Sequence, residues 1–179
     1  MVRKKPNSLH RLVEGGVIAA LYTALSLCLA PFSFGPVQLR VAEMLTLLPV
    51  FTPAAVPGLA VGCAITNAVG LMMGANVAGA LDILCGTAAT LLAAMLTRAW
   101  RRYRVGGVPF LASLPPVVFN GFVIGLELTL VFYPTFSWPL FWLNVGQVAA
   151  GQALACVLGG LLLCGVLERS GVARRLFRR

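Results

Sequence analysis

Charged residues are scarce in this sequence. They make up 11% of its 179 residues, and apolar residues make up 59%, whereas roughly a quarter of a soluble domain is charged. A soluble fold of this composition would expose large apolar patches, which soluble monomers rarely do. Disorder is excluded for the opposite reason, because disordered chains are poor in apolar residues. The composition therefore predicts an integral membrane protein in a lipid bilayer.

Three residue types that carry much enzyme chemistry are almost missing. The only lysines are Lys4 and Lys5, which excludes a P-loop of the form G-x-x-x-x-G-K-[ST]. The only histidine, His10, precedes the first apolar run, which excludes an H-E-x-x-H zinc site and a Ser-His dyad in the membrane. The single aspartate, Asp82, excludes a protease with two catalytic aspartates. We predict that the chain is not an enzyme and holds no cofactor, so that any ATP is used by a partner.

The cysteines show no arrangement that would bind a metal. There are five, all inside apolar segments, with no C-x-x-C pair and no metal-ligand spacing. This pattern predicts that they pack in the core. They are Cys28, Cys63, Cys85, Cys156 and Cys164.

Positive charge is concentrated in three places. The formal net charge is +9, and all but one of the 14 basic residues lie in three short segments. Such clusters are typical of cytoplasmic loops. No aromatic residues are interleaved with them, so we do not expect a nucleic-acid partner. The clusters are Arg3, Lys4, Lys5 and Arg11; Arg98, Arg101, Arg102 and Arg104; and Arg169, Arg174, Arg175, Arg178 and Arg179.

Six apolar segments separate these clusters, four before the middle cluster and two after it. A membrane helix needs about 20 residues, which all but the second segment reach or approach. The second is short and contains Arg40 and Glu43, so we expect it to be tilted or partly re-entrant. Because an even number of membrane crossings separates each pair of neighbouring clusters, all three clusters lie on the same side of the membrane. We therefore predict an all-α membrane protein, a single six-helix bundle over residues 1–179 with both termini cytoplasmic and helices near 12–30, 37–51, 54–73, 77–97, 110–133 and 140–167.

Polar residues inside the segments fall toward the outer half of the membrane in this topology. A charge at this depth costs about 2.5–3.5 kcal/mol and usually faces a cavity or a partner. We predict an outward-facing binding pocket, the alternative being polar contacts that only hold helices together. Arg40 and Glu43 are three residues apart and could pair with each other. The candidates are Arg40, Glu43, Asn67, Asp82, Asn120, Glu127, Asn144 and Gln147, with Trp138 at the adjoining loop.

Small residues recur every four positions on several segments, which lets helices approach closely. Gly58 with Gly62, and Gly121 with Gly125, are expected to pack inside the bundle. The stripe on the first segment could instead serve a partner. It consists of Gly16, Ala20 and Ala24.

Two runs of the sequence resemble the signature of the QueT family of queuosine-precursor transporters. They are Ser33-Phe34-Gly35-Pro36-Val37-Gln38-Leu39-Arg40-Val41-Ala42-Glu43 and Leu48-Pro49-Val50-Phe51-Thr52-Pro53-Ala54-Ala55-Val56-Pro57-Gly58-Leu59. Asp82, Gly86-Thr87 and Pro115-Pro116-Val117-Val118-Phe119-Asn120 fit the same pattern, and the resemblance covers about residues 15–168.

The resemblance implies a substrate-binding (S) component of an energy-coupling factor (ECF) transporter in a bacterial cell membrane. It implies six helices, an outward-facing pocket, and partnership with a membrane coupling subunit and two ATP-binding-cassette ATPases. It also implies that the small-residue motif Ala20-x-x-x-Ala24 docks the coupling subunit.

A 7-deazaguanine substrate fits the polar residues of the predicted pocket. Its ring N–H and exocyclic amine form a donor pair for one carboxylate, its carbonyl suits an amide donor, and its flat face suits an aromatic side chain. Phe34, Trp138 and Trp142 are the nearby aromatics. If Arg40 neutralises Glu43, Asp82 and Glu127 remain, one for the guanine-like edge and one for an aminomethyl cation. The alternatives are an S component for another small vitamin, a stand-alone ion-coupled secondary transporter, and a structural subunit that binds no small molecule.

Overall fold

The computed structural model describes residues 8–34, 39–76 and 78–177. These residues form helices and connecting turns, with no β-strand among them. The all-α prediction is therefore confirmed.

Five helical stretches are long and apolar enough to cross a membrane. The first and second are α1 (Ser8–Cys28) and α3 (Ala55–Met72). The third is α4 (Leu81–Ala99) continued by η2 (Trp100–Arg102), and the fourth is η3 (Phe110–Ser113) continued by α5 (Leu114–Phe132). The last comprises α6 (Trp138–Gln152), the π-helical turn η4 (Ala153–Gly160) and α7 (Leu161–Arg169). Two short helices, α2 (Ala30–Ser33) and α8 (Val172–Phe177), lie outside these stretches.

The second predicted segment is not a full-length helix. Residues 37 and 38 lie outside the described residues, and the helix that follows is η1 (Val41–Val50), a 3₁₀ helix of ten residues. At about 2.0 Å per residue it is about 20 Å long, short of the ~30 Å hydrocarbon core. Eight of its residues are buried, so protein surrounds a segment that lipid alone would not accommodate. Six full spans are therefore not confirmed.

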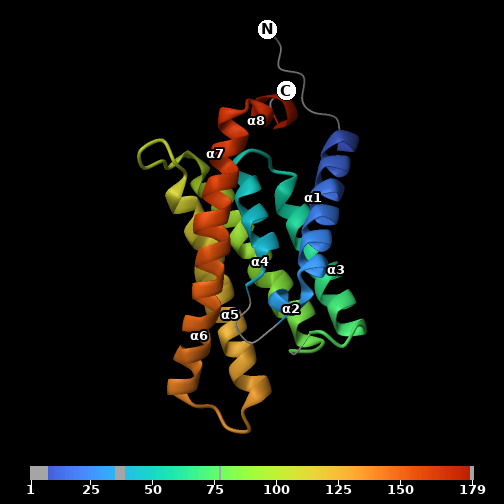
Figure 1. Cartoon of the computed structure of the whole chain (residues 1–179), viewed down its shortest axis with the longest axis vertical. Coiled ribbons are helices and arrows are strands. Elements are labelled where there is room, and N and C mark those ends of the chain that lie inside the picture. Colours follow the sequence, from blue (N-terminus) through green and yellow to red (C-terminus); the bar gives the residue numbers. More distant parts are fainter. Residues whose placement is uncertain (1–7, 35–38, 77, 178–179) are drawn as a thin grey trace.

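The basic clusters gather at one end of the bundle. Figure 1 shows the start of α1, the connection between α4 and α5, and α8 at this end, with the α3–α4 and α5–α6 connections at the other. Arg104 donates to both carboxylate oxygens of Glu168, over 2.6 and 3.1 Å. Arg98 donates to the carbonyl of Pro49 over 2.8 Å. We call this the basic end. Its cytoplasmic location remains a prediction, and Arg3, Lys4, Lys5, Arg178 and Arg179 lie outside the described residues.

Glycines bring two pairs of helices into close contact. A Cβ at Gly58 of α3 would lie 2.6 Å from the carbonyl oxygen of Gly15 in α1. A Cβ at Gly125 of α5 would lie 2.7 Å from the Val145 side chain of α6. Since atoms cannot approach so closely, larger residues would separate the helices. The predicted internal packing is confirmed, and it includes Gly62 and Gly121.

The cysteines are only partly in the core. Cys63, Cys156 and Cys164 are buried, as expected. Cys28 is exposed at the end of α1, so the prediction of core packing is wrong for it. Within the described parts of the chain, no group of three or more His, Cys, Asp or Glu residues could hold a metal ion.

The predicted topology can be tested by labelling intact cells. In a variant without its five native cysteines, Arg102→Cys should not react with a membrane-impermeant maleimide, because this position lies at the basic end. Thr135→Cys, exposed in the connection between α5 and α6, is the matched control and should react. Efficient labelling at position 102 from outside would overturn the assigned orientation.

Candidate functional site

Arg40 is buried at the end of the bundle opposite the basic end. It precedes η1, is 4% exposed, and has an extended backbone. Its Nη2 donates to Oδ1 of Asn67 over 3.0 Å and lies 3.5 Å from Oδ2 of Asp82, forming an ion pair. Its Nη1 lies 3.7 Å from Sγ of Cys63. One guanidinium thus joins the start of η1 to both α3 and α4.

The expected pairing of Arg40 with Glu43 is wrong. The spacing of three residues would bring the side chains together on a helix, but Arg40 lies before the helix, with φ −85° and ψ 94°. Its side chain therefore reaches across to Asp82. Glu43 accepts a hydrogen bond from the hydroxyl of Tyr22 in α1 instead.

Asp82 is held from several directions. It lies in the first turn of α4, where the helix dipole favours a negative charge, and it is 0% exposed. Nδ2 of Asn76 donates to its Oδ2 over 3.0 Å, and Nδ2 of Asn67 donates to its backbone carbonyl over 2.7 Å. A Cβ at Gly86, one turn later, would lie 2.7 Å from that Asn67 nitrogen. The absence of a side chain at Gly86 therefore makes room for the amide.

Three carboxylates in this region keep oxygens without a protein partner. Among the described residues, no hydrogen-bond partner reaches Oδ1 of Asp82, Oε2 of Glu43 or either carboxylate oxygen of Glu127. Glu127 is 4% exposed, on the same buried face of α5 as Asn120, whose Nδ2 also lacks a partner. Ile124 and Leu128, on either side of Glu127, belong to a buried core cluster against which Cys85 of α4 packs. This part of α5 therefore lies beside the start of α4. The predicted alignment of Asn120 with Glu127 is confirmed.

We use the name polar cluster for six buried polar residues: Arg40, Glu43, Asn67, Asp82, Asn120 and Glu127. Direct contacts join three of them, namely Arg40, Asn67 and Asp82. The polar cluster contains one cation and three carboxyl groups. Burying an ionised group is costly unless it is paired and hydrogen-bonded. The unpartnered oxygens are therefore suited to bind N–H donors or a cation.

Three predicted site residues do not join the polar cluster. Asn144 donates to the hydroxyl of Thr129 over 2.9 Å, so it links α6 to α5, as the alternative interpretation proposed. Gln147 is half-buried. Trp138 is 64% exposed and packs edge-on against Phe136 and Phe141 at the α5–α6 connection.

Of the three aromatic residues considered for the pocket, Phe34 is the one that contacts the polar cluster. It is buried, and its ring lies so close to Gly70 that a Cβ there would overlap it. The guanidinium carbon of Arg40 lies 5.5 Å from the ring centroid, within cation–π distance. Trp142, the third aromatic considered, is exposed.

Tyr22, Cys63 and Asn76 contact the polar cluster but are not among the site residues predicted from the sequence. Tyr22 had a usable signal, because it lies in the middle of an apolar segment, whereas membrane tyrosines concentrate at the interfaces. Asn76 follows α3 among glycines, and this pattern indicates only that a helix ends there. Cys63 carried no signal that distinguished it from a core cysteine.

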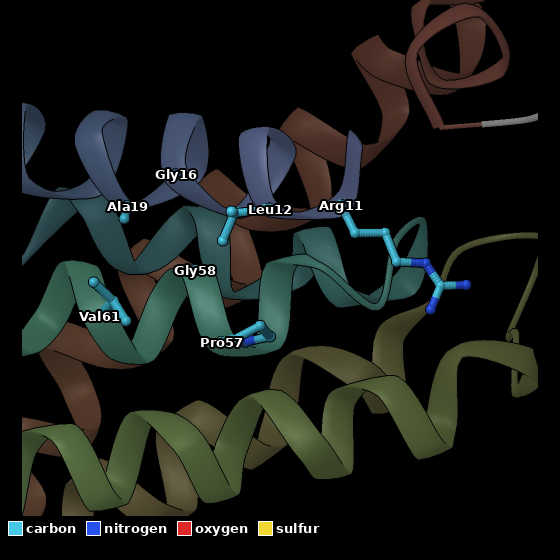
Figure 2. A pocket seen from close by; sticks show the side chains of 8 residues that line it. Arg11, Leu12, Gly16, Ala19, Pro57, Gly58 and Val61 are labelled. Atoms are coloured by element: carbon cyan, nitrogen blue, oxygen red, sulfur yellow. The ribbon is translucent and has the colours of Figure 1, made fainter. Parts of the chain in front are cut away.

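The predicted docking stripe on α1 faces away from the bundle. Gly16, Ala20 and Ala24 are all exposed, and a Cβ at Gly16 would meet nothing within 4 Å. A groove runs beside it between α1 and α3, with Leu12 and Val61 among its lining residues (Figure 2). The stripe therefore does not pack against the described parts of this chain.

Comparison with known proteins identifies related sequences. The family model described as QueT transporter matches residues 12–169. The chain is 26% identical over 175 residues to the queuosine precursor transporter QueT of Lactococcus lactis subsp. cremoris (strain MG1363), covering 95% of this chain and 99% of that protein. No solved structure matches.

The ion pair predicts how substitutions in the polar cluster affect stability. Arg40→Gln leaves the carboxylate of Asp82 buried without its cation, which costs about 3–5 kcal/mol for a buried pair. Thermal unfolding of the purified protein should therefore shift to a clearly lower temperature. Adding Asp82→Asn removes the unpaired charge and should recover much of the loss, while Arg102→Gln, at an exposed position, is the control. An unchanged unfolding temperature for Arg40→Gln would contradict the assigned role of the pair.

Proposed function

The chain belongs to the QueT transporter family, and we propose that it is the substrate-binding subunit of an ECF-type importer that captures a queuosine precursor of the 7-deazaguanine type. As a member of this family it is a transporter of the cell membrane and not an enzyme. The observation that carries the proposed substrate is the set of buried carboxylate oxygens in the polar cluster that have no partner among the residues the structure describes.

The chemistry of the polar cluster supports this substrate. A deazaguanine presents two adjacent N–H donors, which one carboxylate can accept through charge-assisted bonds. Arg40 already compensates Asp82, so Glu43 and Glu127 are left for the ligand, one for the guanine-like edge and one for an aminomethyl cation. Among the described residues the amide nitrogen of Asn120 has no partner, so it can donate to the ring carbonyl. The buried ring of Phe34 lies in the same region, beside Arg40.

Two features support coupling to separate ATPases. With only Lys4 and Lys5, the chain contains no P-loop lysine, so ATP hydrolysis must take place elsewhere. The exposed stripe of Gly16, Ala20 and Ala24 would let a helix of the membrane coupling subunit approach α1 closely. In this assembly the coupling subunit and two ABC ATPases supply the energy, and this chain supplies the specificity.

A stand-alone ion-coupled secondary transporter is the second candidate. The buried carboxyl group of Glu127, with both oxygens unpartnered among the described residues, is the observation in its favour. Uptake by vesicles that contain this chain but no ATPases would establish the second candidate. Native mass spectrometry of the purified protein would distinguish a deazaguanine from another small vitamin.

Neutralising the free acids should weaken substrate binding. Glu43→Gln or Glu127→Gln leaves ligand donors desolvated and unpaired, which costs about 2–5 kcal/mol, or tens- to thousands-fold in affinity. The measurement is calorimetry with 7-aminomethyl-7-deazaguanine. The amide keeps the size of the side chain, so folding should survive.

Glu168→Gln, at the basic end, is the matched control and should bind as the unaltered protein does. A 7-cyano analogue, which lacks the cation, should lose affinity for the unaltered chain. If Glu43 and Glu127 can both be neutralised without loss of affinity, the cluster is structural and the proposed substrate site is wrong.

A bulky residue on the stripe should block assembly. Ala20→Trp places an indole where the coupling subunit would approach, so co-purification with that subunit should be lost while deazaguanine affinity is kept. Ala150→Trp, at an exposed position of α6, is the control. Co-purification that survives Ala20→Trp would show that this face of α1 is not the docking surface.

A further inference from the structure

Helix α1 presents two different faces. Its outer face carries the exposed stripe, whereas Tyr22 is 0% exposed. Tyr22 lies two residues from both Ala20 and Ala24, which is about 200° around the helix axis. The buried tyrosine and the exposed stripe therefore lie on opposite sides of the same two turns.

The buried face of α1 is bonded to the polar cluster. The Tyr22 hydroxyl donates to Oε1 of Glu43 in the first turn of η1. Thr23, the next residue, donates to the carbonyl of Gly62 in α3 over 3.2 Å and so does not reach Glu43. Of the side-chain hydrogen bonds from α1 in the described residues, the one from Tyr22 ends on the polar cluster.

Glu43 is held by hydrogen bonds at its backbone carbonyl and at one of its two carboxylate oxygens. Its backbone carbonyl accepts hydrogen bonds from Thr46 over 2.6 Å and from Cys156 of η4 over 3.4 Å. Tyr22 occupies Oε1, while Oε2 has no partner in the described residues although the side chain is 1% exposed. A donor that binds Oε2 would act on the carboxylate that Tyr22 holds, and through it on α1.

We propose that Tyr22 is a positioning residue that directs Oε2 of Glu43 toward the substrate and transmits substrate binding to α1. This inference rests on the proposed function, because it takes the polar cluster as the substrate site. The physical basis is that a donor on Oε2 fixes the carboxylate that Tyr22 already holds through Oε1, so that the bound substrate restricts the motion of Glu43 and, through the Tyr22 bond, that of α1. Occupancy of the site then stabilises the helix whose outer face is exposed for docking.

The test combines binding with amide hydrogen exchange on the purified full chain. In the unaltered protein, 7-aminomethyl-7-deazaguanine should slow exchange in both η1 and α1. Tyr22→Phe keeps the ring and removes only the hydroxyl. We expect about a ten-fold loss of affinity, as for a hydrogen bond to a charged group. At saturating ligand, the slowing should persist in η1 and disappear from α1.

Two comparisons separate this role from simple packing. Thr23→Val also removes a hydrogen bond that a hydroxyl of α1 donates, but this bond does not end on Glu43. The variant should therefore keep its affinity for the ligand and the slowing of amide exchange when the ligand binds. Tyr22→Phe combined with Glu43→Gln should bind no more weakly than Glu43→Gln alone, because both act through one carboxylate. Unaltered affinity and retained slowing of α1 in Tyr22→Phe would overturn the proposal.

Failure of the proposed substrate is a distinguishable result. If the unaltered chain binds no deazaguanine, the proposed function is wrong. Amide hydrogen exchange of the ligand-free protein then tests whether the Tyr22–Glu43 hydrogen bond couples α1 to Glu43. Tyr22→Phe and Glu43→Gln each weaken the hydrogen bond between α1 and η1, so both should speed amide exchange in α1 and in η1. Thr23→Val removes a bond to α3 instead, so it should leave exchange in η1 unchanged. Unaltered α1 exchange in both variants would refute the link.

Discussion

The burial of one arginine among three carboxyl groups is the constraint on which the rest of this structure depends. Arg40 cannot be buried alone, because an isolated charge in a low-dielectric interior is prohibitively costly. Its contacts with Asp82 and Asn67 bring the start of η1, the first turn of α4 and the inner face of α3 to one place. The gap at Gly86 and the amide of Asn76 complete the arrangement. Because these groups satisfy Asp82 only in part, the same region has the capacity to bind a ligand.

The short helix η1 requires a matching irregularity in the helix beside it. Eight of its ten residues are buried, and it packs against η4, where the last long helix widens into a π-helical turn. A Cβ at Gly160 would lie 2.8 Å from the side chain of Leu47, so the glycine lets η1 approach. Cys156 on the same turn contacts the carbonyl of Glu43. π-Helical turns are frequent at functional sites, and here one contacts the backbone of Glu43, a residue of the polar cluster.

The position of α1 at the edge of the bundle joins the two parts of the proposed function. Its contacts with α3 are made through Gly15 and Gly58, so one face is tightly packed while the other stays open. A helix held on one side by small residues and by one buried hydrogen bond from Tyr22 can respond to changes at the polar cluster. Under the proposed function, this geometry would link substrate capture at the polar cluster to partner docking on α1.

Composition and charge placement were sufficient to predict three features. The membrane environment and the all-helical fold follow from hydropathy. The gathering of the basic clusters at one end follows from the even number of apolar segments between them. Spacing along a helix correctly aligned Asn120 with Glu127, since both lie on one regular helix. Tertiary structure alone decided which charges pair. Arg40 lies just outside a helix, so helical spacing did not apply and its partner came from a segment 42 residues away, Asp82. It also decided that the second segment, which the sequence already marks as short, forms a buried 3₁₀ helix and that Tyr22 meets Glu43, because both result from packing between segments distant in sequence.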